Sequence, residues 1–283
     1  MTLSEKTDPS AKKQRNWAAT ILIGISIIYL LFILYIPTLN LFYFAFRNGI
    51  GPFFANMTTP AFLHAAWLTF ILSVITLPLN TIFGLCAAWA IARNQFPGRA
   101  FLLSLIDLPF SISPVVAGLM IILLYGRQGW FGEFLQEQGI RVVFAFPGIV
   151  LATAFVSMPF VAREVIPVLE EMGKEQEEAA KTLGANGWQI FWRVTLPHIR
   201  WGVLYGLILT NARAMGEFGA VAVVSGNIRG RTQSLPLFIE DAYKQYETQA
   251  AFSAAVLLAL LAVVTVILKE ILERRTHSNR RTH

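Results

Sequence analysis

The chain has 283 residues, of which 55% are hydrophobic and only 14% are charged, and its mean hydropathy is +0.56. A soluble globular protein of this size needs more polar surface, so the composition excludes that class and predicts an integral membrane protein. The net charge of +6 does not indicate nucleic-acid binding, because the basic residues are divided among several polar segments. The single cysteine, Cys86, cannot form a disulfide within the chain.

The apolar pattern predicts an all-α membrane protein with six transmembrane helices. Residues 1–16 form a polar tail, residues 17–272 the membrane domain, and residues 273–283 a basic tail. Stretches of about 20 apolar residues are long enough to cross a bilayer. The predicted spans are about 17–46, 67–91, 101–125, 144–165, 201–224 and 250–268.

The distribution of basic residues predicts the orientation of these spans. Six spans place both termini and the polar segment 170–200 on the same side of the membrane. Of the 23 Lys and Arg residues, 16 fall on that side and six on the other, and Arg213 lies inside a span. Because Lys and Arg are enriched in cytoplasmic loops, both tails and the segment 170–200 are expected in the cytoplasm.

The polar segment 170–200 separates the fourth and fifth spans. Glu175–Glu178 places three carboxylates in the first turn of a predicted helix, where the helix dipole favours negative charge. Gly184 predicts the end of that helix, since glycine readily adopts the positive φ of a C-terminal turn. A second short helix is expected over Trp188–Thr195, ended by Pro197.

Seven residues of this segment resemble a known motif. Their spacing resembles that of the EAA loop in permease subunits of bacterial ABC importers, with Val where Ile is usual. The resemblance implies the type I importer permease fold and a coupling helix that docks on an ATP-hydrolysing subunit. A chance match within a solvated loop helix is the alternative. The residues are Glu178, Ala179, Ala180, Gly184, Val194, Leu196 and Pro197.

The fifth span carries polar residues where an apolar run is expected. Asn211, Arg213, Gly216 and Glu217 fall within seven positions. Arg213 is expected near the bilayer midplane, where an arginine costs about 3 kcal/mol and must face protein, water or an anion. Glu217 lies one helical turn further and can pair with it. The pair either holds helices together or lines a translocation pathway.

The same span carries a GxxxG pattern formed by Gly202 and Gly206. Small residues at this spacing let two membrane helices approach closely. We therefore expect close helix packing along the fifth span, with a dimer interface at the pathway.

The third span contains Asp107, Ser111 and Ser113, and Pro109 and Pro114 predict a kink or break in it. The serine hydroxyls could contact a solute in the pathway, or they could bond to a backbone carbonyl one turn back. A carboxylate repels anions, so Asp107 is expected to have a gating or structural role, or to be paired or protonated.

Two segments give a narrower resemblance. The run from Asn211 to Tyr246 resembles the permeases that import sulfate, thiosulfate, molybdate or tungstate, and Val223–Gly230 and Asp107–Leu119 resemble W-type permease subunits of sulfate/thiosulfate importers. The resemblance implies a T-type permease partner, two ATPase subunits that bind ATP and Mg²⁺, and an extracytoplasmic sulfate-binding protein. It also implies a bacterial inner membrane location.

The chain itself carries no nucleotide site, because Gly173 and Lys174 are followed by Glu175 rather than Ser or Thr. No catalytic residue or metal site is predicted, so the chain is not expected to be an enzyme. Three alternatives to a sulfate permease stay open: a molybdate or tungstate permease, an ion-coupled carrier, and a membrane scaffold without transport activity. An ion-coupled carrier usually has acidic or histidine relay groups within its spans, and here Asp107 and Glu217 are the few acidic candidates, which weakens that alternative.

Overall fold

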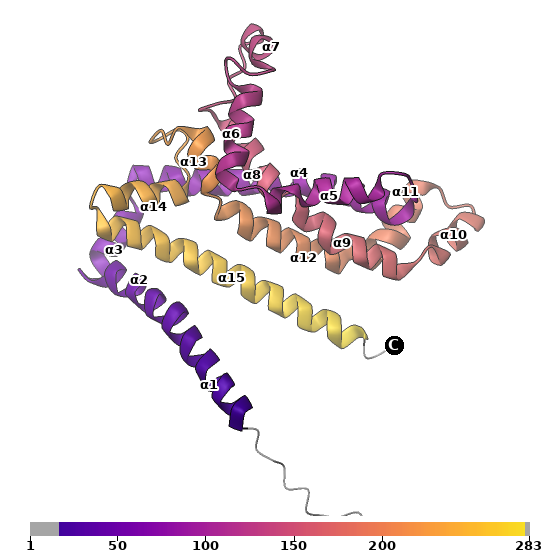
Figure 1. The fold of residues 1–283 in the computed structure, drawn as a ribbon, viewed down its shortest axis with the longest axis horizontal. Helices are drawn as coiled ribbons and strands as arrows, with labels where there is room; N and C mark the ends of the chain where they lie inside the picture. Colours follow the sequence, from indigo (N-terminus) through magenta and orange to yellow (C-terminus); the bar gives the residue numbers. More distant parts are fainter. Residues whose placement is uncertain (1–16, 281–283) are drawn as a thin grey trace, which may run out of the picture.

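The computed structural model describes residues 17–280, and every regular element among them is helical (Figure 1). The predicted all-α fold is confirmed for this part of the chain, and the predicted tail at residues 1–16 lies outside it. The elements are α1 (Trp17–Leu30), the π-helical η1 (Leu31–Tyr35), α2 (Ile36–Phe46), α3 (Ile50–Met57), α4 (Pro60–Arg93), α5 (Arg99–Ser111), α6 (Pro114–Tyr125), α7 (Gly132–Glu137), α8 (Phe146–Ser157), α9 (Pro159–Met172), α10 (Glu175–Thr182), α11 (Gly187–Ile190), the π-helical η2 (Phe191–Thr195), α12 (Leu196–Met215), α13 (Gly219–Ser225), α14 (Leu235–Lys244) and α15 (Thr248–Arg280).

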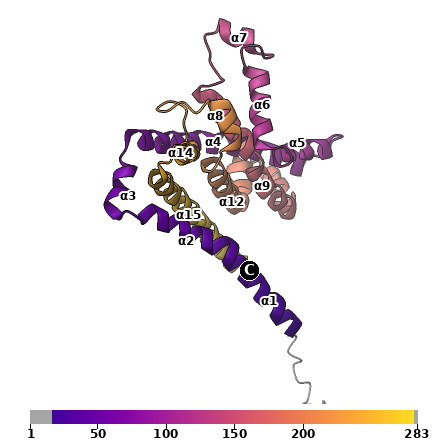
Figure 2. The ribbon, with the colours of Figure 1, turned by 60° about the vertical axis from the view of Figure 1, so that its left-hand side comes forward.

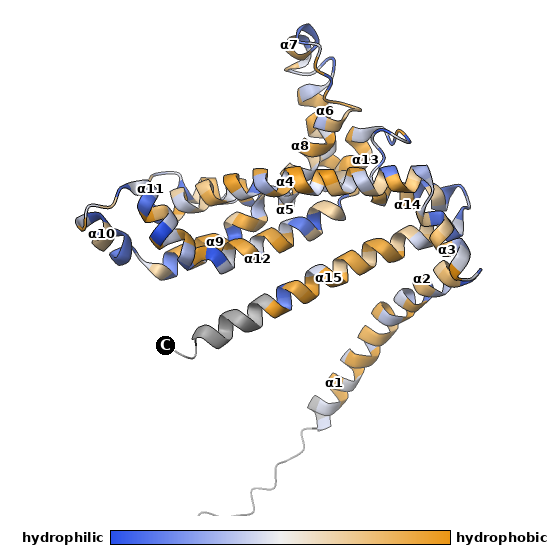
Figure 3. Cartoon of the chain, turned by 180° about the vertical axis from the view of Figure 1, so that it is seen from behind, coloured by the Kyte–Doolittle hydropathy of each residue, from blue (hydrophilic) through white to orange (hydrophobic). Residues whose placement is uncertain are grey.

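Within residues 17–280, four helical stretches are long and apolar enough to cross a membrane, and the long helices are apolar over most of their length (Figure 3). Two further candidates are bent pairs, α5 with α6 at 109° and Gly187–Met215 with α13 at 52°. The total is six if each bent pair is one span, which is the number that the sequence predicts. The four stretches are Thr20–Phe46, Pro60–Arg93, Phe146–Met172 and Thr248–Ile271.

The break between α5 and α6 follows from Pro114. A proline disfavours the helical conformation at the residue before it, and here Ser113 and Ile112 both have extended ψ angles of 134°. The chain therefore leaves α5 and turns sharply into α6, which projects from the bundle together with α7 (Figure 2). At its base α6 packs closely on α13, where a methyl group added at Gly118 would lie 2.8 Å from the Ala220 carbonyl oxygen.

The centre of the bundle is built on α4, α9 and α12, which meet at the fully buried Val161. A methyl group at Gly84 of α4 would lie 2.7 Å from Val161 Cβ, and one at Gly206 of α12 would lie 2.8 Å from Val161 Cα. Gly202 packs one turn away against Glu164 and Val168 of α9. The close packing predicted for the GxxxG pattern is confirmed, but it lies within the chain. The dimer interface expected along the fifth span stays a prediction.

The predicted helix end at Pro197 is wrong, because the helix continues from Gly187 to Met215. Pro197 lies in the first turn of α12, directly after the π-helical turn Phe191–Thr195. A proline ring clashes with the carbonyl group four residues earlier, and the wider π turn gives that carbonyl room. The same arrangement occurs at Leu31–Tyr35, which is followed by Pro37.

The two ends of the described chain lie along one side of the bundle. Helix α2 packs on α15, with Phe44 stacked on Phe252 at 5.2 Å between ring centroids, whereas α1 extends away from the other helices (Figures 1 and 2). Helix α15 contains the predicted span 250–268 and continues beyond it to Arg280. Its sequence contains neither glycine nor proline, so nothing in the backbone stops the helix where the apolar run ends.

Candidate functional site

Helix α10 and the turn after it form a compact polar unit at one end of the bundle (Figures 1 and 3). Glu175, Glu177 and Glu178 lie in its first turn. Gly184 has φ +85°, the Gly184 amide donates to the Lys181 carbonyl at 3.0 Å, and the Ala185 amide donates to the Ala180 carbonyl at 3.1 Å. The predicted glycine turn is thus confirmed, and it leaves the side chain of Leu183 88% exposed.

A capping box begins the next helix. The Asn186 side chain accepts a hydrogen bond from the Gln189 amide at 2.9 Å, and the Asn186 amide donates to Gln189 Oε1 at 3.0 Å. This reciprocal arrangement satisfies two backbone N–H groups that a helix start leaves without partners. The spacing of Asn186 and Gln189 in the sequence is a local signal for this start, and it was not among the predicted features. It fixes the direction in which the loop re-enters the bundle.

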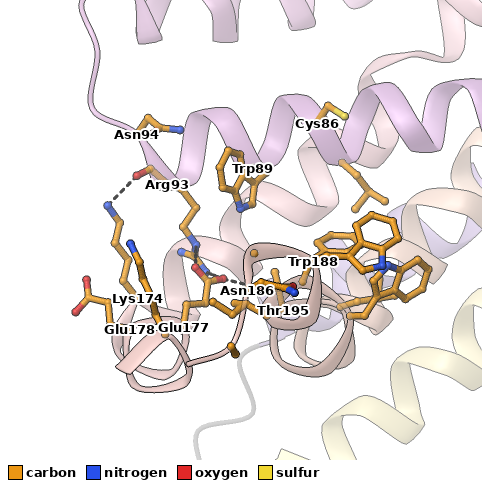
Figure 4. Close-up of a pocket in the computed structure, with 18 of the residues that line it drawn as sticks. Cys86, Trp89, Arg93, Asn94, Lys174, Glu177, Glu178, Asn186, Trp188 and Thr195 are labelled. Carbon is orange, nitrogen blue, oxygen red and sulfur yellow. Dashed lines mark hydrogen bonds and ion pairs between the residues drawn. The ribbon is translucent and has the colours of Figure 1, made fainter. Parts of the chain in front are cut away.

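Arg93, the last residue of α4, holds α10 against the bundle (Figure 4). Its Nε atom lies 2.9 Å from Glu177 Oε2, and its Nη1 atom donates to the Leu169 carbonyl of α9 at 2.8 Å. The Thr195 hydroxyl donates to the same carboxylate at 2.8 Å, and Lys174 Nζ donates to the Arg93 carbonyl at 2.7 Å. These five residues tie α4, α9, α10 and η2 together, and we call them the Arg93 latch.

The glutamate of the EAA motif is not part of the Arg93 latch. Glu178 is exposed and its carboxylate lies away from Arg93, whereas the neighbouring Glu177 points inward (Figure 4). The first alanine of the motif, Ala179, is exposed beside Glu178. The structure therefore divides two adjacent glutamates between an inner and an outer side of α10. The remaining motif residues are half-buried Ala180, Val194 and Leu196, exposed Gly184 and exposed Pro197.

A cavity of about 1170 Å³ lies between α4 and the loop that contains α10 and α11 (Figure 4). Its apolar wall includes Cys86 and Trp89 of α4 and Trp188 of α11. Its polar end is formed by the Arg93 latch, with Arg93 and Glu177 on the lining. The loop thus contacts α4 chiefly through charged side chains at one end, with an apolar gap beyond them.

The break between α12 and α13 is bridged by the predicted pair of charged residues. Arg213 Nη1 lies 2.6 Å from Glu217 Oε2, and the Glu217 side chain is 2% exposed. Its other carboxylate oxygen accepts a hydrogen bond from the Ala220 amide at 2.8 Å, in the first turn of α13. Gly216 is the C-cap of α12, and Asn211 accepts a hydrogen bond from the Ser73 hydroxyl of α4. The predicted pairing is confirmed, and the carboxylate also caps the second half of the broken span.

Asp107 is paired, which was one of the predicted states, but its partner was not predicted. Arg163 Nε of α9 lies 2.7 Å from Asp107 Oδ1 of α5, and its guanidinium group lies 4.7 Å from the centre of the Phe110 ring. Arg163 lies before the end of the predicted fourth span, although it is one of the 16 basic residues assigned to the cytoplasmic side. Ser111 and Ser113 are exposed at the α5–α6 break, and Ser113 does not cap α6 with its side chain.

The loop between α13 and α14 lies at the end of the bundle opposite α10 (Figure 1). Burial opposes ionisation of Asp241, but hydrogen bonds from Arg229, Gln233 and Gln245 outweigh it and lower the pKa of this carboxyl group. Gln233 is 1% exposed and also donates to Asn227 Oδ1 at 3.0 Å. The loop is therefore a fixed, internally bonded structure.

Solved membrane transporters share this fold. A bacterial ABC transporter involved in the import of the acidic polysaccharide alginate superposes with a TM-score of 0.77 at 20% identity, over 92% of this chain and 96% of that one. An amino acid ABC transporter gives a TM-score of 0.53 at 19% identity, over 76% and 94% of the two chains. The helical bundle with its projecting polar loop is thus the fold of an ABC importer permease subunit.

Sequence comparison gives the family. Residues 80–278 match the family of binding-protein-dependent transport system inner membrane components, and the chain belongs to this family. It is 64% identical to the sulfate transport system permease protein CysW of Synechocystis over 90% of this chain and 93% of that protein. It is 51% identical to CysW of Escherichia coli over 92% and 89% of the two chains. The chain is therefore a multi-pass membrane protein of the importer class, and by its family it is not itself an enzyme.

Proposed function

We propose that this chain is the W-type permease subunit of an ATP-driven importer for sulfate and thiosulfate, and that it works by alternating access. The assignment of the substrate rests on the 51 to 64% identity to proteins named sulfate transport system permease protein CysW. Identity to proteins named CysT is lower, at 34 to 37%. This difference supports the W-type assignment and makes a T-type subunit the natural partner.

The exposed side of α10 is the proposed docking surface for the ATPase subunits. Glu178 and Leu183 are exposed there, while Glu177 on the inner side is fixed to Arg93. Two such subunits would bind ATP and Mg²⁺, and ATP binding would close the two subunits against each other. A displacement of α10 would then reach α4 and α9 through the Arg93 latch, because charged hydrogen bonds at the helix ends are short and strong.

Reorientation of the bundle would follow at its breaks. Packed helices transmit such a displacement as rigid bodies, and segments at helix ends absorb the change in angle. The bends between α5 and α6 and between α12 and α13 are the places in the described chain that fit this role. A doubly charged oxyanion cannot cross hydrocarbon, so the pathway between the two permease subunits must be wet or lined with donors.

The remaining partners and the location rest on the family. One of the solved relatives by fold is an alginate ABC transporter in complex with a periplasmic binding protein, which supports an extracytoplasmic binding protein here. For this chain it would be a sulfate-binding protein. The distribution of basic residues supports a bacterial inner membrane orientation with both termini and α10 in the cytoplasm.

Uptake of labelled sulfate tests the proposal. The chain is reconstituted into vesicles with its T-type partner, the ATPase and the sulfate-binding protein, and uptake is measured with and without ATP. We expect uptake that requires ATP and that thiosulfate competes more strongly than molybdate. Uptake without ATP would support an ion-coupled carrier, and stronger competition by molybdate would contradict the sulfate assignment.

A further inference from the structure

Helix α9 has a charged side that the described chain covers only in part. Arg163, Pro167 and Glu170 are exposed and recur at helical spacing along one face. The opposite face is buried in the core and consists of Val161, Val165 and Leu169. Such a helix is ordinary on a soluble protein, but α9 continues α8 within the apolar stretch Phe146–Met172. An exposed charged face is therefore unusual at this place.

Two ion pairs join this face to α5. Asp107 pairs with Arg163 at 2.7 Å, and Arg99 pairs with Glu170. The two pairs are eight residues apart on α5 and seven apart on α9, so they match an antiparallel contact of the two helices. The side chains of Arg163 and Asp107 are nevertheless 54% and 39% exposed. The pairing with Asp107 and the contact with the Phe110 ring therefore leave about half of the Arg163 side chain open to a third partner.

Arg163 and Asp107 both lie within apolar membrane segments. Arg163 is within the stretch Phe146–Met172, two residues before the predicted end of the fourth span, and Asp107 is within the predicted third span. A charged pair within hydrocarbon is costly, so it must face a water-filled cavity or another protein surface. Gly202 and Gly206 of α12 pack against α9 at the level of Arg163 but on its other side, at Val161, Glu164 and Val168, so α12 does not cover Arg163.

We propose that α5 and α9 line an aqueous part of the translocation pathway, and that Arg163 there binds the passing tetrahedral oxyanion. This inference rests on the proposed function and adds a binding residue to it. A guanidinium group presents a planar set of donors that suits a doubly charged oxyanion. When no anion is bound, the Asp107 carboxylate accepts hydrogen bonds from the Arg163 guanidinium group, so Asp107 competes with the anion for these donors. Competition keeps the site weak enough for release, as a conducting pathway requires.

Sulfate uptake in matched variants tests the anion contact. Arg163→Gln is compared with Arg99→Gln, which removes the other ion pair between the same two helices. We expect uptake to fall about tenfold or more in Arg163→Gln and to stay within about twofold of wild type in Arg99→Gln. Arg163→Lys should retain part of the activity. An equal effect of the two Gln variants would mean that both pairs only hold the helices together, and would overturn the proposal.

The double variant Asp107→Asn with Arg163→Gln separates binding from folding, because it replaces the ion pair by two neutral hydrogen-bonding groups. If the pair is only structural, this variant regains the uptake lost in Arg163→Gln. The proposal requires that uptake stays low while the amount of assembled complex in the membrane returns to the wild-type level. Normal uptake in Arg163→Gln beside an active wild type would refute the anion contact and leave the proposed function intact.

Labelling with a charged, membrane-impermeant thiol reagent tests the aqueous face independently of the substrate. In a Cys86→Ser background, Pro167→Cys places a thiol one turn from Arg163 on the exposed face, and Val264→Cys places one on the exposed apolar surface of α15. We expect position 167 to react much faster than position 264. Equal, slow reaction at both positions would show that α9 faces lipid and would overturn the proposal even for a complex that carries another anion.

Discussion

Arg93 and Glu177 form an ion pair at 2.9 Å that joins the end of α4 to α10, and both side chains are largely buried. The adjacent Glu178 is exposed. The two glutamates are neighbours in sequence but differ in environment. A substitution of Glu177 therefore tests the stability of the loop, and a substitution of Glu178 tests its docking on a partner. Removing one partner of a buried pair leaves the other charge unpaired, which typically costs about 3–5 kcal/mol.

The first prediction compares these two neighbours. Glu177→Gln should lower the thermal unfolding midpoint of the purified permease, because Arg93 keeps its buried position without a carboxylate. Glu178→Gln should leave the midpoint unchanged, since an exposed carboxylate contributes little to stability. The measurement is thermal unfolding of both variants in the same detergent. Equal midpoints for the two variants would mean that the Arg93 latch does not hold the loop.

The second prediction concerns the contact of α12 with α9. Gly206→Ala adds a methyl group 2.8 Å from Val161 Cα, and backbone atoms on both sides prevent a local adjustment. We expect a loss of roughly 1–3 kcal/mol in the free energy of unfolding, the usual range for overpacking. Gly24→Ala in α1 is the control, because an added methyl group there meets no atom within 4 Å. Equal stability of the two variants would contradict the packing.

The third prediction concerns the two contacts of Glu217. Glu217→Gln loses the charge opposite Arg213 but keeps an oxygen for the Ala220 amide, whereas Glu217→Ala loses both contacts. Both variants should reduce the amount of folded protein in the membrane, and the Ala variant should reduce it further. Quantitative detection of the solubilised protein measures this order. If Gln and Ala have the same effect, the carboxylate does not cap α13.

The fourth prediction is a pH dependence at Asp241, which lies in α14 and pairs with Arg229 of the loop before it. The pKa of Asp241 is lowered from its ordinary value of 3.8, so its ionised form stabilises the folded state. This contribution is fully present above about pH 4 and is lost as the pH falls through the lower pKa of the folded protein. Asp241→Asn should flatten the pH dependence of the unfolding midpoint in that range. An unchanged pH profile would show that Asp241 does not contribute.

Sequence patterns predicted the features that depend on local chemistry. The six apolar stretches, the turn at Gly184 and the pairing of Arg213 with Glu217 all follow from spacing along one segment. Contacts between distant segments could not be predicted in this way. Arg93 and Glu177 are 84 residues apart, and Asp107 and Arg163 are 56 apart, so neither pair leaves a local signal.

Proline and glycine gave incomplete information at two places for the same reason. Pro197 normally ends a helix, but a π turn before it removes the clash and lets the helix continue. Gly202 and Gly206 mark close helix packing, yet the sequence does not say whether the partner belongs to the same chain. In both cases tertiary packing decides an outcome that the local sequence leaves open.

The most direct test of the account is the coupling of ATP hydrolysis to sulfate uptake in two variants of α10. Glu178→Arg changes the exposed side proposed to dock on the ATPase, and Gln176→Arg places the same side chain roughly 200° around the helix. We predict that Glu178→Arg abolishes uptake and its stimulation of ATP hydrolysis while the chain is still inserted, and that Gln176→Arg retains both. Normal coupled uptake in Glu178→Arg would contradict the assignment of α10 as the coupling helix.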